Sequence, residues 1–176
     1  MKNKILNIFL SILFSNFIYF NANSIEQFNF DVTEIEIINE GNIIRGLGKG
    51  TVKTYDGITI TADTFVYDKI LNILTADSNV EIIDNNRDLK IYSDNAVYQK
   101  NDEIITTNQN SKAIYGIGKF LYADTFIFNR NENILNAKGN VEFENTIDDH
   151  SIIGNDFTYF KNSEKIITKG ETKALI

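Results

Sequence analysis

The chain has 176 residues with no cysteine and no proline, and 24 acidic residues against 17 lysines and arginines give a net charge of −7. The absence of cysteine excludes disulfides, thiolate catalysis, thiolate zinc sites and a lipid attached through an N-terminal cysteine. The acidic balance argues against nucleic-acid binding, and no basic stripe with interleaved aromatic residues compensates for it.

The first 24 residues predict an export signal. Lys2 and Lys4 give a basic start, residues 5–20 are mostly apolar, and residues 22–24 offer small side chains for a cleavage site. An uncleaved membrane anchor is the alternative, although this apolar stretch is short for a span of about 20 residues. Cleavage would leave 152 residues with a net charge of −9, because the signal contains two lysines and no acid.

One pattern of four positions recurs in the rest of the chain: an apolar residue, Asp three later, an aromatic four after that, and Ile six further on. Successive Asp residues are 31, 30 and 32 positions apart, while the spacing inside the pattern is constant. This indicates that one supersecondary unit was copied, with insertions in its turns. A weaker copy with Thr33 in place of Asp precedes them. The four copies are Ile60/Asp63/Tyr67/Ile73, Ile91/Asp94/Tyr98/Ile104, Leu121/Asp124/Phe128/Ile134 and Ile153/Asp156/Phe160/Ile166.

Within each unit, apolar and polar residues alternate as in β-strands. Even-numbered positions are apolar in residues 58–62 and odd-numbered positions in residues 63–67, so the parity changes at Asp63. Such a change predicts a bend or bulge, where Asp tolerates an irregular backbone. We therefore expect the repeated Asp residues to be corner residues rather than an acidic or calcium-binding ladder. Polar turns follow the aromatic position, and a second strand is expected to begin at Ile73, Ile104, Ile134 or Ile166.

The sequence thus predicts an all-β fold. We expect residues 25–176 to form a single domain of about five units, each of about 30 residues and each giving one strand to each of two facing sheets. The product would be an open two-sheet β-jellyroll, a V-shaped sandwich about 24 Å deep at about 4.8 Å per strand. A parallel β-helix is the alternative, since its coils also repeat at about 20–30 residues.

Catalytic motifs are weak. His150 is the only histidine and lies between acidic residues and a predicted strand, with no Ser/His/Asp grouping around it. Residues 45–50 share glycines with a phosphate loop but lack its Gly-Lys-Ser/Thr, and a strand follows. We therefore expect no enzyme, no cofactor and no metal site.

The repeats resemble the OstA-like family of lipopolysaccharide transport proteins. The family's motif has two parts: Ala-Asp with an alternating run to an aromatic residue, and then Ala-x-Gly-Asn-Val. It occurs at residues 123–128 and 137–141, and in a nearly identical form at residues 62–67 and 76–80. The resemblance covers roughly residues 30–176, although the copy that contains Asp94 has Asn108-Gln109-Asn110 at the second part of the motif. It implies a periplasmic protein of lipopolysaccharide transport and outer-membrane assembly. The chain would be a soluble LptA-like bridge, or the head of an LptD-like translocon attached to the outer membrane.

The resemblance also implies that lipid A acyl chains lie in a hydrophobic trough between the two sheets, with the headgroups outside in solvent because the chain is acidic. The same residues would also fill a closed core, and a structural fibre or adhesin module without lipid binding is the alternative function. The residues expected to line the trough are Phe65, Tyr67, Tyr98, Phe126, Phe128, Val141 and Phe143.

Both ends of the stack are expected to present unpaired strand edges. Ile35 and Ile37 would lie on the first edge, and Ala174 and Ile176 on the last. Natural proteins normally blunt such edges, so exposed ones favour pairing with another strand. The expected partners are lipopolysaccharide and other OstA-like modules of a transport bridge, joined edge to edge.

Overall fold

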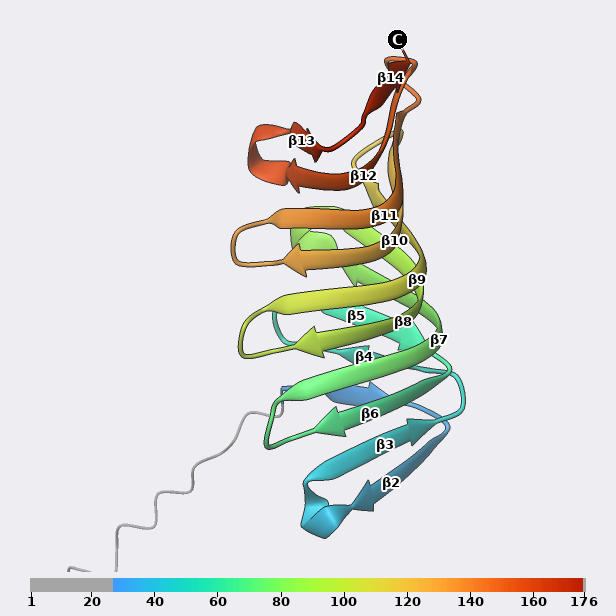
Figure 1. Cartoon of the computed structure of the whole chain (residues 1–176). Helices are drawn as coiled ribbons and strands as arrows, with labels where there is room; N and C mark the ends of the chain where they lie inside the picture. Colours follow the sequence, from blue (N-terminus) through green and yellow to red (C-terminus); the bar gives the residue numbers. More distant parts are fainter. Residues whose placement is uncertain (1–26, 176) are drawn as a thin grey trace, which may run out of the picture.

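The computed structural model describes residues 27–175 (Figure 1). The predicted export signal and Ile176 lie outside this range. Fourteen strands and three single-turn 3₁₀ segments, at Asn39–Gly41, Asn85–Arg87 and Lys161–Ser163, make up its regular structure, which confirms the all-β prediction. No helix in the described part is long and apolar enough to cross a membrane. The strands are β1 (Asn29–Asp31), β2 (Glu34–Ile38), β3 (Ile43–Leu47), β4 (Gly50–Lys53), β5 (Ile58–Ala62), β6 (Thr64–Asp68), β7 (Ile73–Asp84), β8 (Leu89–Gln99), β9 (Ile104–Tyr115), β10 (Lys119–Asn129), β11 (Ile134–Asn145), β12 (His150–Phe160), β13 (Lys165–Lys169) and β14 (Lys173–Leu175).

All fourteen strands belong to one continuous sheet rather than to two separate sheets. The main path runs β1-β4-β5-β7-β8-β9-β10-β11-β12-β13, with β6, β3 and β2 extending it from β7, and β14 pairing with β12. Every pairing within residues 27–175 is antiparallel. The parallel β-helix alternative is therefore wrong.

The sheet folds over on itself because its long strands, β7 to β12, each bend where the pairing register shifts. Figure 1 shows the two resulting layers facing each other, and we call them the front arm and the back arm. The front arm comprises β2, β3, β6, β13 and residues 73–77, 95–99, 104–108, 125–129, 134–138 and 156–160. The back arm comprises β1, β4, β5, β14 and residues 80–84, 89–93, 111–115, 119–123, 141–145 and 150–154.

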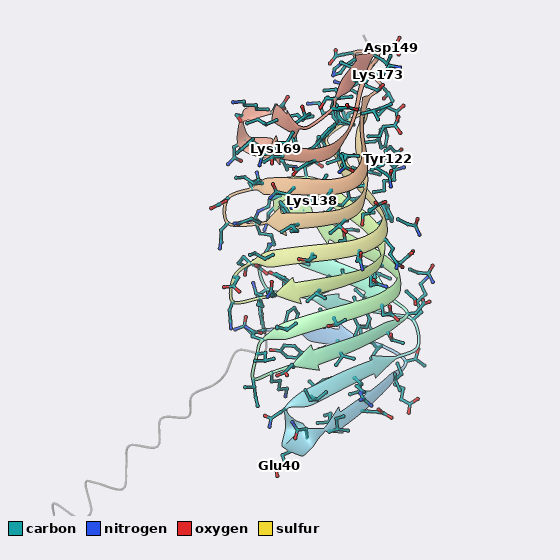
Figure 2. All side chains as sticks on the ribbon, in the orientation of Figure 1. Glu40, Tyr122, Lys138, Asp149, Lys169 and Lys173 are labelled. Atoms are coloured by element: carbon teal, nitrogen blue, oxygen red, sulfur yellow. The ribbon has the colours of Figure 1, made fainter. Side chains whose placement is uncertain are left out.

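Each repeat supplies two strands to each arm, not one as predicted, because each of its long strands crosses the bend. Residues 89–115, for example, contribute β8 and β9 to both arms. Ten strands in each arm at about 4.8 Å spacing give a stack about 43 Å long, nearly twice the predicted depth. Figure 2 shows Glu40, next to β2, at one end of this stack and Lys173, on β14, at the other.

The bends confirm that repeated Asp residues are corner residues in three of the four copies. In each of these three copies, an Asn with a left-handed backbone donates a side-chain hydrogen bond to the Asp 16 residues before it. Its positive φ is the conformation that Asn tolerates better than most residues. The pairs are Asn79–Asp63 (2.7 Å, φ 56°), Asn110–Asp94 (2.7 Å, φ 49°) and Asn140–Asp124 (3.0 Å, φ 47°).

The fourth copy is shifted by one residue from its predicted position. In β12 the unpaired residue of the bend is Asn155, because Gly154 pairs with Val141 and Asp156 already pairs with Lys138. The side chain that faces inward is consequently Tyr159, which is buried, whereas Phe160 is partly exposed. In this copy, the aromatic residue four positions after the Asp is therefore not the one that faces inward, although the spacing is the same as in the other copies.

A glycine at the third corner gives a prediction. Gly139 has φ +75°, and a Cβ added there would overlap the Asp124 carboxylate. Gly170 has φ +84°, and a Cβ added there would have no atom of the described residues within 4 Å. Gly139→Ala is expected to lower the free energy of unfolding by more than Gly170→Ala, which meets only the left-handed backbone cost of about 1–2 kcal/mol. Urea denaturation of both variants measures the difference. Equal losses would show that the Asp124–Asn140 contact contributes nothing.

Candidate functional site

The space between the arms is lined by two continuous apolar rows, one on each arm. Each row passes from one cross-strand partner to the next through ten strands, and this continuity follows from the alternation in every strand. The front row is Ile37, Ile44, Tyr67, Leu74, Tyr98, Ile105, Phe128, Leu135, Tyr159 and Ile166. The back row is Phe30, Val52, Ile60, Ile82, Ile91, Ala113, Leu121, Phe143, Ile152 and Ala174.

All seven residues predicted to line the trough lie in this interior, and each is at most 6% exposed. Phe65, Tyr67, Tyr98, Phe126 and Phe128 come from the front arm, and Val141 and Phe143 come from the back arm. They belong to one cluster of buried apolar side chains that joins the two arms. In this structure the cluster is packed as a core.

The side of the molecule opposite the bends is closed by polar contacts between the turns of the two arms. We call this line of contacts the seam; it involves front-arm turns 100–103, 130–133 and 161–164 and back-arm turns 54–57, 84–88 and 116–119. At its centre Arg130 is only 1% exposed. Its Nε donates to Asp84 Oδ2 at 2.9 Å, and its Nη1 donates to Asp56 Oδ2 at 2.6 Å and to Tyr98 Oη at 2.7 Å. It also pairs with Glu103 of its own arm.

Further contacts cross the seam on both sides of Arg130. Lys100 Nζ lies 2.9 Å from Asp56 Oδ2, and Arg87 Nε donates to the Arg130 carbonyl at 2.9 Å. Lys161 Nζ donates to the carbonyl oxygens of Arg87 and Asp88. Near the last strands, Lys119 of the back arm pairs with Glu164 of the front arm at 2.9 Å. The interior is therefore shut off from solvent along this side.

The seam shifts the ionisation of its acids. Burial by itself raises the pKa of Asp56, but hydrogen bonds from Thr54, Arg130 and Lys100 outweigh it and hold that pKa well below its ordinary value. Glu103 behaves in the same way, since burial is outweighed by hydrogen bonds from Lys100 and Tyr98 and by the charge of Arg130, and its pKa is also lowered. Both acids are thus ionised and paired at neutral pH.

These lowered pKa values predict loss of stability in acid. A carboxyl group with a lower pKa in the folded state stabilises the fold above its unfolded pKa of about 4, and this contribution disappears as the pH falls toward the folded value. The free energy of unfolding is therefore expected to decrease between about pH 5 and pH 3. Urea titrations over this range measure it, and Asp56→Asn should show a smaller decrease. An Asp56→Asn variant with an unchanged pH dependence would contradict the assignment.

Sequence reasoning missed the seam, although a signal for it exists. Lys69, Lys100, Arg130 and Lys161 each follow an inward aromatic residue of the front row by two positions. The turns that hold them were predicted only as polar connections. Lys69 is exposed, whereas the other three reach across toward the back arm. The recurrence of a cation marks the position, but its burial depends on the acids opposite.

The ends of the sheet are free strand edges. Among residues 27–175, β2 pairs only with β3 and β1 only with β4, while β13 and β14 each pair only with β12. Ile35 and Ile37, predicted for edge pairing, lie on β2 and are 48% and 63% exposed; Ala174 is exposed on β14. Ile37 and Ala174 also end the two apolar rows. The fourth predicted edge residue, Ile176, is outside the described residues.

Within residues 27–175, no group of three or more His, Asp or Glu side chains is arranged to hold a metal ion. The acidic corner residues lie at successive bends, each bonded to its own Asn. The corner assignment rather than the ladder accounts for them.

The fold and interior define a class of protein: one antiparallel sheet, folded around an apolar interior, with free edges at both ends. No family model and no curated protein matches the sequence. Among solved structures, the chain is similar to LptH of Pseudomonas aeruginosa, described as the LptA-homologous periplasmic component of the lipopolysaccharide transport device. The TM-score is 0.57 at 15% identity, covering 64% of this chain and 82% of LptH. The chain has an LptA-like fold, and the resemblance seen in the repeats is confirmed at the level of the fold.

Proposed function

We propose that this protein takes part in lipopolysaccharide transport by holding the acyl chains of lipid A between the two arms. The observation that carries this proposal is the pair of apolar rows running without interruption through ten strands of each arm. A lipid that moves along the molecule needs an apolar surface that is continuous from one edge of the sheet to the other. A closed core does not need this continuity. The similarity to LptH supports the same function.

The energetics suit a carrier. Burying about ten methylene groups at ~0.8 kcal/mol each gives ~8 kcal/mol, which corresponds to micromolar affinity before the costs of ordering the chains. Such affinity keeps acyl chains out of water and still lets them move on. The headgroup stays outside in solvent, because the interior is apolar and the chain is acidic.

The proposal places the protein in the periplasm, reached through an export signal in residues 1–24, with residues 25–176 as a single OstA-like β-jellyroll domain and no enzymatic activity. Other OstA-like modules would pair with β2 through Ile35 and Ile37, and with the last strands through Ala174 and Ile176. Pairing there would extend both apolar rows into the next molecule. A free LptA-like bridge and an LptD-like head attached to the outer membrane use the same contacts.

Photocrosslinking tests the proposal. A benzophenone amino acid is introduced at Phe126, which is fully buried, and at Val97, whose side chain lies on the outer face of the same arm. After incubation of the purified protein with lipid A, a crosslinked adduct is expected from position 126 and not from position 97. Parallel substitutions at Phe65 and Phe143 extend the test to both arms. A protein that retains no lipid A would instead be the structural spacer of the alternative function.

A further inference from the structure

We infer that a hydrocarbon chain enters the interior through the end formed by β11 to β13, which we call the C-terminal mouth and define by Phe143, Ile152, Tyr159 and Ile166. The inference rests on the proposed function and adds the route and the residues that control it. The interior has three boundaries through which a chain could pass: the seam and the two ends of the stack. The side-chain contacts that close these three boundaries differ.

The C-terminal mouth already contains a cavity of about 340 Å³ between the arms. Phe143 and Ile152 line it from the back arm, and Tyr159 and Ile166 line it from the front arm. This volume lies within the range of small-ligand pockets. The cavity is continuous with both apolar rows, since these four residues are members of them. These four side chains form an apolar wall that fits a hydrocarbon chain. The rest of the lining is polar or charged and suits a polar head that stays in water; it consists of Lys119, Asn145, Asp148, His150 and Glu164.

The opposite end is filled by the chain's own first described residues. Phe28 is buried, and its ring packs edge-on against Tyr67 and Tyr98 at centroid distances of 4.7 and 5.8 Å. Phe30 meets Phe65 at 6.3 Å. Because β1 pairs with the back arm, these rings cross the interior to reach front-arm residues. A lipid entering at this end must first displace them.

Entry through the seam must separate Arg130 from Asp84 and Asp56. Arg130 and Asp84 are each 1% exposed, so separation breaks a fully buried ion pair and leaves Arg130 with Glu103 and Asp84 with the partly exposed Arg87. This is the most unfavourable of the three routes, because breaking a buried ion pair is strongly destabilising.

Behind the C-terminal mouth, by contrast, ring contacts join the arms in the interior, and the Lys119–Glu164 ion pair crosses only the exposed rim. Tyr115 of the back arm stacks on Tyr159 of the front arm at 4.3 Å and lies 6.4 Å from Phe143. The hydroxyl of Tyr115 is buried and has no hydrogen-bond partner in the part of the chain that the structure describes. An acyl chain that parts this stack replaces ring contacts with its own apolar contacts and breaks no hydrogen bond of Tyr115. The mouth and the stack form one path into the interior.

Loading kinetics test this route on neighbouring positions of β13. Ile166 faces the interior, whereas Ile167 is 39% exposed on the outer face. With a dansyl-labelled fatty acid as the probe and stopped-flow fluorescence as the readout, Ile166→Glu is expected to slow loading by about tenfold or more, because a carboxylate then lies in the path of the chain. Ile167→Glu should load at the wild-type rate. Circular dichroism verifies that both variants are folded.

A reversible crosslink tests the other end without changing the interior. Asn29 of β1 and Lys53 of β4 are cross-strand partners with exposed side chains, and the chain has no cysteine of its own. Oxidation of an Asn29→Cys/Lys53→Cys variant fixes Phe28 and Phe30 in place, and loading is expected to be the same before and after oxidation.

Slower loading after oxidation, or an Ile166→Glu variant that loads at the wild-type rate, would overturn the route while leaving lipid binding intact. A wild-type protein that binds neither the probe nor lipid A would overturn the proposed function, and the route with it.

Discussion

Replacing Arg130 with methionine is expected to lower the free energy of unfolding by about 3–5 kcal/mol, because it breaks a fully buried ion pair and leaves Asp84 with only the partly exposed Arg87. For a chain of this length the loss corresponds to a fall in melting temperature of about 6–20 °C. Urea and thermal denaturation followed by circular dichroism measure both quantities. Methionine keeps most of the side-chain volume, so the loss of stability is caused by removal of the charge rather than by a cavity.

Two further variants separate the buried charge from its position in the turn. Lys69→Met changes the corresponding cation of an earlier turn, where the side chain is exposed, and is expected to alter stability by less than about 0.5 kcal/mol. Adding Asp84→Leu to Arg130→Met removes the buried acid that has lost Arg130 as a partner and should recover part of the loss. If the double variant is no more stable than Arg130→Met alone, the broken Arg130–Asp84 pair is not the cause.

Phe65→Ala is expected to cost about 3–5 kcal/mol of stability, since Phe65 is 1% exposed and its removal leaves a cavity between the arms. Val66→Ala is the matched control, because Val66 follows directly on β6, points outward and is 41% exposed. Its expected effect is below about 1 kcal/mol. Chemical denaturation of the two variants, each with and without lipid A, gives the comparison.

The denaturation measurements with lipid A connect stability to function. A ligand that binds only the folded state stabilises it by RT ln(1 + [L]/Kd), which is about 2.7 kcal/mol at a hundred times Kd. Lipid A should therefore shift the denaturation midpoint of the wild type and of Val66→Ala alike. Identical midpoints with and without lipid A would contradict binding in the interior.

Much of the fold could be predicted from the sequence because it depends on local alternation. The change of parity at Asp63 and Asp124 correctly placed bends, since a residue added to one strand moves every later side chain to the other face. The inward positions of Phe65, Tyr67, Phe126 and Phe128 followed from the same alternation. In β12 this reasoning failed by one residue, because the bend falls at Asn155 and the Asp-to-aromatic spacing cannot reveal it.

By itself, then, the sequence determined the strands, the corners and the apolar face, because these follow from the side chains of adjacent residues. Only the tertiary structure decided that each long strand crosses both arms, which residues fill each end, and that Arg130 is buried. The back-arm acids that pair with Arg130 are Asp84 and Asp56, which are 46 and 74 residues away along the chain. A charged residue in a polar turn is solvated unless the fold places a partner opposite it, and local pattern carries no information about that partner.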